Sequence, residues 1–114
     1  MVRLRAQQLI SPDFTEVKDV VAWMGAIQAQ QPRMAKLALG IRTRGATMEQ
    51  IRQALDRGEI LRTHVLRPTW HYVSPSDIRW MLKLSCNRLK SAYASSMKGH
   101  GLTITEQVYD TANQ

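Results

Sequence analysis

The chain has 114 residues, which is enough for one domain with a modest core. Its 44% hydrophobic content and six methionines are typical of a packed globule and exclude a disordered tail. Sixteen lysines and arginines against nine acidic residues give a formal net charge of +7. This balance favours a polyanionic partner, nucleic acid first and an acidic membrane surface second, with a merely basic soluble protein as the plain alternative.

The only cysteine is Cys86, which excludes an internal disulfide and a zinc cluster built from thiolates. A reducing compartment suits such a chain. The basic N-terminus lacks the apolar stretch of a secretory signal, and no apolar run is long enough to span a membrane. We therefore expect a cytoplasmic, nucleoid-associated protein with no membrane partner.

Two helices are expected in the first quarter of the chain. The first covers residues 3–10 and is stopped by Ser11 and Pro12. The second begins at Thr15 as its N-cap and runs to about Gln28. Its apolar positions have the i, i+3, i+4, i+7 spacing of one buried face: Val17, Val20, Val21, Met24 and Ile27.

Two further helices follow. One is expected from Arg33 to Thr43, and its predicted buried positions are Met34, Leu37, Ala38 and Ile41. The next begins with a capping box, Thr47 at the N-cap and Gln50 at N3, and Gly58 ends it as the C′ residue. Its predicted inward positions are Met48, Ile51, Ala54 and Leu55.

Residues 60–66 and 70–73 are rich in β-branched and aromatic side chains, which predicts a β-hairpin joined by Arg67-Pro68-Thr69. Three helices followed by a hairpin is the order of a winged helix, in which the helix before the hairpin enters the major groove. We therefore expect a mainly α fold with a short β-hairpin, a winged helix-turn-helix, followed by a long C-terminal helix.

That long helix is expected to begin around Ser74-Pro75 and to reach Met97. Its predicted inner face consists of Ile78, Met81, Leu82, Ser85, Leu89, Ala92 and Tyr93. Residues 79–98 contain five basic residues and no acid, so this helix either follows DNA phosphates or presents an ordinary solvated surface.

Gly99-His100-Gly101 is predicted to be a flexible joint, which makes residues 1–98 the winged-helix domain and residues 99–114 the joint and the start of a following segment. Thr103 and Glu106 form a second predicted capping box, but the helix after it has only some eight residues before the chain stops. So short a helix is marginal alone, and we expect this segment to be truncated from a longer protein.

Gln28 and Gln30 are the candidate functional residues of this part of the chain. Gln28 continues the apolar face of the second helix, where a buried amide without partners costs about 1–3 kcal/mol. Pro32 disfavours helix at the residue before it, which places Gln30 in a turn. Either the two amides converge on one ligand or water in a cleft, or both cap helix ends.

The sequence contains no paired carboxylates, Ser-His-Asp set, phosphate-cradling glycine loop or zinc-protease motif. His64 and His71 are expected to be neighbours across the hairpin, but a third metal ligand is not evident, and we predict no metal site and no cofactor. Trp70 and Tyr72 alternate with His71, and such aromatics are either core residues or platforms on which a base stacks.

Three segments together resemble the beginning of the AlkZ-like family of winged-helix DNA glycosylases. They are Leu4-Arg5-Ala6-Gln7, then Gly25-Ala26-Ile27-Gln28-Ala29-Gln30, then residues 62–73, Arg62-Thr63-His64-Val65-Leu66-Arg67-Pro68-Thr69-Trp70-His71-Tyr72-Val73. The resemblance implies tandem winged-helix motifs, removal of alkylated purines and unhooking of interstrand crosslinks. It also implies that a Gln-x-Gln motif, here Gln28 and Gln30, positions the water that attacks the sugar carbon.

Such a pair of neutral amides serves only a leaving group that is already activated, and N-alkylation supplies one because the positively charged purine departs readily. One residue departs from the family pattern: Pro68 stands where the family often has glycine, so the tip of the wing is expected to have a different turn. Relatives place further winged-helix motifs C-terminal to this one, so this chain alone is expected to be inactive.

We therefore interpret the chain as the N-terminal winged-helix domain of a DNA glycosylase-like repair protein, with double-stranded DNA and the remaining C-terminal domains of the parent chain as partners. The expected catalytic pair is Gln28 and Gln30. The expected DNA contacts are Arg52, Gln53, Arg57, Arg62 and Arg67. The alternatives are a non-enzymatic DNA-binding module such as a transcriptional regulator, and a protein-interaction domain with an incidental basic surface.

Overall fold

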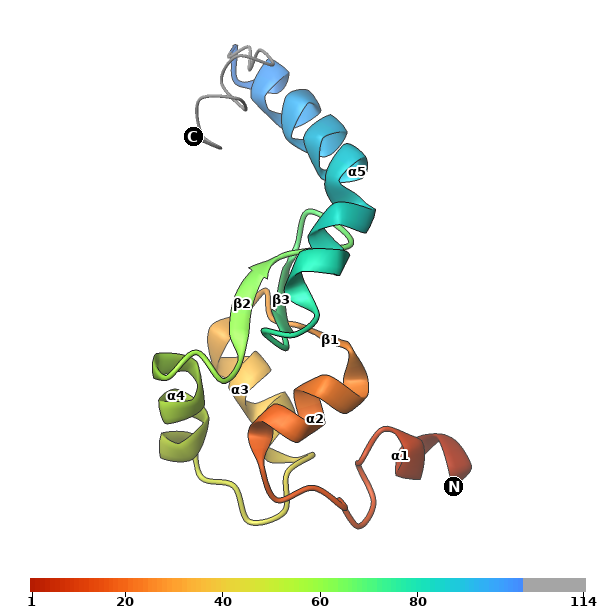
Figure 1. The fold of residues 1–114 in the computed structure, drawn as a ribbon, viewed down its shortest axis with the longest axis vertical. Helices are drawn as coiled ribbons and strands as arrows, with labels where there is room; N and C mark the ends of the chain where they lie inside the picture. Colours follow the sequence, from red (N-terminus) through yellow and green to blue (C-terminus); the bar gives the residue numbers. More distant parts are fainter. Residues whose placement is uncertain (102–114) are drawn as a thin grey trace.

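The computed structural model describes residues 1–101 of the chain. Figure 1 shows their arrangement: a group of short helices lies at one end, a small sheet follows, and one long helix extends away from both. The elements are α1 (Val2–Ala6), α2 (Val17–Met24), β1 (Ala26–Gln28), α3 (Pro32–Gly40), α4 (Met48–Asp56), β2 (Leu61–His64), β3 (Trp70–Val73) and α5 (Ile78–Gly99). The described part is thus a mixed α and β structure with five helices and three strands.

The three strands form one antiparallel sheet in the order β1-β3-β2. The predicted hairpin of β2 and β3 is confirmed, and its register pairs Arg62 with Tyr72. The sequence did not predict β1, whose Ile27 pairs with Tyr72 on the other edge of β3. The segment between α2 and α3 therefore belongs to the sheet and is held beside the central strand.

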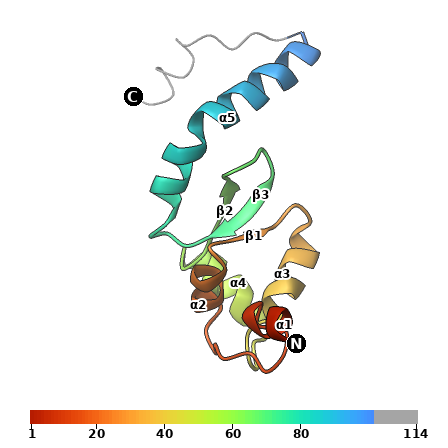
Figure 2. The ribbon, with the colours of Figure 1, turned by 90° about the vertical axis from the view of Figure 1, so that its right-hand side faces the viewer.

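Two hydrophobic clusters lie on opposite faces of this sheet. The larger one joins α2, α3 and α4 to the face that carries Ile27 and Tyr72. The smaller one contains Val65, Val73 and Met81, and it packs the start of α5 against the other face. Figure 2 shows the sheet between the helical group and α5. Alternation along each strand produces this division, because successive side chains point to opposite faces.

The second helix ends earlier than its apolar pattern predicts. Val17, Val20 and Val21 are buried as expected, but α2 stops at Met24 because Gly25 follows with φ +73°. Glycine adopts this left-handed conformation without strain and turns the chain into β1. The expectation that Gln28 lies on a helix is therefore wrong. Ile27 is buried, but as a strand residue.

The first two helices also start or end at different residues from those expected. The first predicted helix, residues 3–10, is confined to Val2–Ala6. The N-cap of α2 is Glu16 in place of Thr15, and no side chain makes a cap hydrogen bond there. Helix boundaries of this kind depend on local bonds that the hydrophobic pattern does not specify.

The predicted buried face of α3 is wrong by one position. Ala35 and Leu39 are the buried residues, whereas Met34, Leu37 and Ile41 are each at least half exposed. The helix spans Pro32–Gly40 and not Arg33–Thr43. Leu39 belongs to the cluster that also contains Ile51 of α4, and this packing decides which stripe of an apolar helix faces inward.

Helix α4 begins with the predicted capping box. The Thr47 hydroxyl accepts a hydrogen bond from the Gln50 backbone N–H at 3.2 Å, and Gln50 Oε1 accepts one from the Thr47 backbone N–H at 2.8 Å. Gly58 follows the helix with φ +69°, as the C′ assignment requires. Ile51 and Ala54 are buried as predicted, but Met48 is half exposed.

The connection between β2 and β3 is unusually tight. Leu66 has φ +63°, in the left-handed region. The N–H of Arg67 donates to the Val65 carbonyl at 2.6 Å, and the N–H of Thr69 donates to the Arg67 carbonyl at 2.7 Å. Each bond spans only two residues, which is the geometry of a γ-turn. Pro68 therefore lies within a closely folded loop.

Helix α5 begins after Pro75 and ends at Gly99, slightly beyond the expected Met97. Met81, Ser85 and Leu89 form its buried face as predicted, whereas Leu82 is exposed. Neither α5 nor any other helix within residues 1–101 has the length and apolar character needed to cross a membrane. The predicted capping box of Thr103 and Glu106 lies outside the described residues.

Candidate functional site

Gln28 and Gln30 lie at and just beyond the end of β1. Both side chains are exposed, and they flank Ala29, which is fully buried. Ile27 is also buried, so this short segment alternates between core and solvent, as extended backbone does. Both amides therefore lie on the solvent side of this segment.

The Gln30 amide is held by the neighbouring strand. Its Oε1 accepts a hydrogen bond from the backbone N–H of Trp70 at 3.2 Å. The backbone continues the same pairing, because the N–H of Ala29 donates to the Trp70 carbonyl at 2.7 Å. Within residues 1–101, neither glutamine caps a helix.

Arg62 on β2 is bonded to the backbone between the two glutamines. Its Nε and Nη2 atoms both donate to the Ala29 carbonyl, at 3.1 and 3.0 Å, and Nη2 also reaches the Gln30 carbonyl at 3.5 Å. The guanidinium carbon lies 4.3 Å from the centroid of the Trp70 ring. The half-buried Arg62 side chain thus contacts both the backbone of the Gln28–Gln30 segment and the Trp70 ring of β3.

Trp70 is partly buried, and two neighbouring side chains pack on its ring. Besides Arg62, the His64 ring lies against it with centroids 4.2 Å apart. His64 in turn stacks on Tyr93 of α5 at 5.9 Å, and its Nδ1 is hydrogen-bonded to the Tyr93 hydroxyl. These contacts connect the hairpin to the middle of α5. Tyr72, the other aromatic of β3, is a core residue, and burial raises the pKa of its hydroxyl.

His71 lies beside Gln28 in the sheet. The two residues are register partners on β3 and β1, so their side chains share a face. His71 is buried, and its Nδ1 lies 2.8 Å from the Thr69 carbonyl oxygen. Because a carbonyl only accepts, Nδ1 must carry the proton. His64 and His71 lie on opposite faces of the hairpin, and the described residues contain no group of three possible metal ligands.

Three of the predicted DNA contacts are already engaged on or beside α4. Arg52 forms ion pairs with Glu49 at 2.6 Å and Asp56 at 2.8 Å. Its hydrogen bond holds the pKa of Glu49 at about 2, below the ordinary 4.5. Gln53 Nε2 donates to Glu49 at 3.0 Å. Arg57 lies 4.0 Å from Glu59. The charge of this helix surface is therefore partly neutralised.

Arg67 differs from the other predicted contacts because its exposed side chain makes no hydrogen bond or ion pair within residues 1–101. It lines a pocket of about 320 Å³ between the hairpin connection and α5. The other residues of this pocket are Leu66, Leu84, Ser85 and Arg88. The two arginines give the pocket a positive charge, and Arg79, Lys83 and Lys98 are also exposed on α5.

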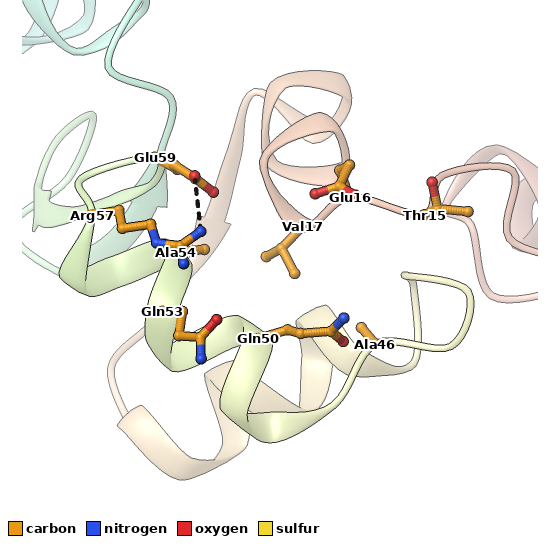
Figure 3. A pocket seen from close by; sticks show the side chains of 9 residues that line it. All are labelled: Thr15, Glu16, Val17, Ala46, Gln50, Gln53, Ala54, Arg57 and Glu59. Atoms are coloured by element: carbon orange, nitrogen blue, oxygen red, sulfur yellow. Dashed lines mark ion pairs between the residues drawn. The ribbon is translucent and has the colours of Figure 1, made fainter.

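A second pocket, of about 180 Å³, lies between the start of α2 and α4 (Figure 3). Val17 points from α2 into this space, and Gln50 and Gln53 border it on the α4 side. The Arg57 and Glu59 pair closes one end. Neither Gln28 nor Gln30 lines it, so this pocket is separate from the glutamine pair.

The sequence predicts both glutamines as candidate site residues but does not predict the bonds that hold this segment. It assigned Arg62 to DNA contact, whereas the structure places its guanidinium against the Ala29 carbonyl and the Trp70 ring. Apolar and polar residues alternate from Ile27 to Gln30, and this pattern fits a strand as well as the end of a helix. The alternation was therefore a sequence signal for β1.

Comparison with known proteins gives the family. The family model described as DNA glycosylase AlkZ-like matches residues 21–113. The chain therefore belongs to the AlkZ-like DNA glycosylase family. A search of curated protein sequences finds no significant match.

Among solved structures, the fold is similar to that of Streptomyces sahachiroi DNA glycosylase AlkZ, with a TM-score of 0.73 and 24% sequence identity. The similarity covers 89% of this chain and 27% of that protein. The chain thus corresponds to about a quarter of the length of the protein it matches. At this identity the likeness concerns the fold, and the family assignment rests on the sequence model.

Proposed function

We propose that this chain is the DNA-binding part of a glycosylase that excises N-alkylated purines, with Gln28 and Gln30 positioning the attacking water. The observation that carries the proposal is the exposure of both amides on either side of buried Ala29, in a chain of this family. DNA is accordingly the proposed substrate, and the net charge of +7 supports a polyanionic ligand.

We further propose that the fold is a winged helix. The element order α2, β1, α3, α4, β2, β3 and the pairing of β1 with β3 support this assignment. In such a domain α4 is the helix before the wing, and the β2 and β3 hairpin is the wing. The same assignment proposes residues 1–98 as the domain and residues 99–114 as its connection to a following segment.

The chemistry asks little of the protein beyond positioning. An N-alkylated purine is a cationic leaving group, so the bond from the sugar carbon to the base breaks with both electrons leaving on the purine. Water then supplies the new oxygen bond at that carbon, and its proton passes to solvent. Two neutral amides orient the water without acting as strong bases, which is sufficient for an activated leaving group.

We propose Arg52, Gln53, Arg57 and Arg67 as the DNA contacts. Arg67 has the best-supported role in this group because its charge is unpaired within the described residues. The three residues of α4 and its end would have to exchange their carboxylate partners for phosphates or bases. Arg62, the fifth residue expected to contact DNA, is hydrogen-bonded to the Ala29 and Gln30 carbonyls.

The test is release of an N7-alkylated purine from duplex DNA by the protein in its full natural length. Wild type is compared with Gln28→Ala and Gln30→Ala, and with Gln31→Ala as a matched exposed glutamine outside the motif. Loss of release in both motif variants, with duplex binding retained, supports the proposal. Normal release by both variants would show that the amides do not position the water.

A non-enzymatic DNA-binding module is the alternative. It predicts salt-sensitive duplex binding and no purine release by wild type. The ion pairs of Arg52 argue against recognition of DNA bases by α4 alone, because two carboxylates hold that side chain. A protein-interaction domain predicts no salt-dependent DNA binding at all, and this result would reject both DNA-based functions.

A further inference from the structure

Arg62 connects the backbone of the glutamine segment to the hairpin. Its guanidinium donates twice to the Ala29 carbonyl, and Ala29 is the residue between the two glutamines. The weaker 3.5 Å approach to the Gln30 carbonyl lies along the same segment. These bonds come from β2, which is not itself a neighbour of β1 in the sheet. Arg62 therefore reaches across the end of the central strand.

The same side chain also packs on the residue that orients Gln30. Its guanidinium lies 4.3 Å from the centroid of the Trp70 ring, and the backbone N–H of Trp70 holds the Gln30 Oε1 atom. Trp70 also accepts the Ala29 N–H at 2.7 Å. One planar cation thus fixes both Ala29 and Trp70. A guanidinium offers two parallel donors and a flat face for stacking, whereas a lysine offers neither.

We propose that Arg62 is a positioning residue for this reaction: it holds the Gln28–Gln30 segment against Trp70 so that both amides keep one fixed geometry. This inference rests on the proposed function. It gives Arg62 a different role from a phosphate contact, because its Nε and Nη2 donors are directed to the protein's own backbone.

The two roles predict different results for the same substitution. Arg62→Met keeps much of the apolar stem and removes the bonds, so the Gln28–Gln30 segment loses its support. We expect the single-turnover rate of purine release at saturating DNA to fall by up to about 100-fold, because small misplacements of positioning groups carry losses of this size. DNA affinity and its salt dependence should stay close to wild type.

A phosphate contact would behave in the opposite way. Arg62→Met would then weaken binding and lower the slope of log affinity against log salt by about 0.9, with a normal rate at saturation. Arg62→Lys separates the roles a second time. Lysine can replace arginine as a phosphate contact, but it restores neither the pair of hydrogen bonds to the Ala29 carbonyl nor the stacking on Trp70. A normal saturated rate in Arg62→Lys would overturn the proposal.

Lys18→Met is the matched control, because Lys18 is exposed on α2 and makes no hydrogen bond or ion pair within residues 1–101. It removes one positive charge, and we expect its rate at saturation to equal that of wild type. Amide exchange checks the fold of each variant. Ile51 in the helical core should keep its protection in Arg62→Met, whereas Ala29 and Trp70 should exchange faster.

Amide exchange also separates this inference from the proposed function. If wild type releases no purine, the glycosylase proposal fails, and exchange at Ala29 and Trp70 still decides whether Arg62 holds the segment. If wild type releases purine and Arg62→Met releases it equally fast with unchanged exchange at Ala29, the inference fails while the proposed function stands.

Discussion

Gln28 and His71 are register partners across β1 and β3, so an exposed amide and a buried imidazole are neighbours on one face of the sheet. The imidazole is fixed in turn by its Nδ1 donation to the Thr69 carbonyl at 2.8 Å. The position of the glutamine segment therefore depends on polar contacts within the hairpin as well as on the hydrophobic core.

We expect His71→Leu to destabilise the protein. The substitution leaves the Thr69 carbonyl without its donor, and the loss of a partner for such a group costs about 1–3 kcal/mol. The free energy of unfolding by urea measures the effect. His100→Leu is the control, since the exposed His100 side chain should change stability by less than about 0.5 kcal/mol. Equal free energies of unfolding for the two variants would show that the hydrogen bond from His71 to Thr69 does not stabilise the protein.

Leu39 and Leu37 on α3 provide a second matched pair. Leu39 is fully buried, and Leu39→Ala should lower the free energy of unfolding by about 2–5 kcal/mol through lost contacts and a residual cavity. Leu37 is 50% exposed, so the same truncation there should cost much less. Chemical denaturation of both variants tests the observed orientation of the helix. A larger effect at Leu37 would favour the face predicted from the sequence.

Chemical denaturation should also measure how much the capping box at the start of α4 contributes to the free energy of unfolding. Thr47→Ala removes the acceptor for the Gln50 N–H, and the expected loss of stability is about 1 kcal/mol. Thr15→Ala is the comparison, because Thr15 was the predicted cap of α2 and the structure assigns that position to Glu16. The cap assignments are wrong if Thr15→Ala proves the more damaging change.

Tyr72 should make stability fall at alkaline pH. Burial raises its pKa above the ordinary 10.0, although the charge of Arg62 acts in the other direction. The folded state therefore retains the phenol proton more strongly than the unfolded chain. The stabilisation is complete below about pH 10 and is lost as the pH rises toward the folded pKa, with a slope of at most about 1.4 kcal/mol per pH unit. Tyr72→Phe should remove this component from the pH profile of the unfolding free energy.

The proposed DNA contacts should differ in their salt dependence. Arg67→Ala removes an unpaired exposed charge, so the slope of log affinity against log salt should fall by about 1. Arg52→Ala should have a smaller effect, because Glu49 and Asp56 already neutralise that guanidinium. Binding titrations at several salt concentrations provide the comparison. Equal slopes for both variants would indicate that Arg52 exchanges its carboxylates for phosphate at little cost.

The elements that the sequence predicted well are those with a local chemical signature. The Thr47 and Gln50 capping box, the Gly58 terminus and the β2 and β3 hairpin are each specified by neighbouring residues, and the structure confirms them. The buried positions Val17, Val20 and Val21 follow from helical periodicity for the same reason.

The errors occur where packing between distant segments decides the outcome. Strand β1 is only three residues long, and its pairing with β3 overrides the helical pattern that the sequence continues to Gln28. Helix α3 is apolar on two adjacent stripes, so contact with α4 selects Leu39 over Leu37. The bonds from Arg62 to the Ala29 carbonyl likewise depend on tertiary structure, so the local sequence does not predict them.

The tight connection between β2 and β3 limits how the tip of the hairpin meets a polyanion. The amide protons of Arg67 and Thr69 are both directed inward to carbonyls two residues away, and Pro68 has none. Residues 67–69 therefore offer no main-chain donor to a phosphate oxygen, and the Arg67 side chain is the donor that this stretch presents to the outside. The tip thus presents one cation to a phosphate, and any contact that it makes with DNA depends on that side chain alone.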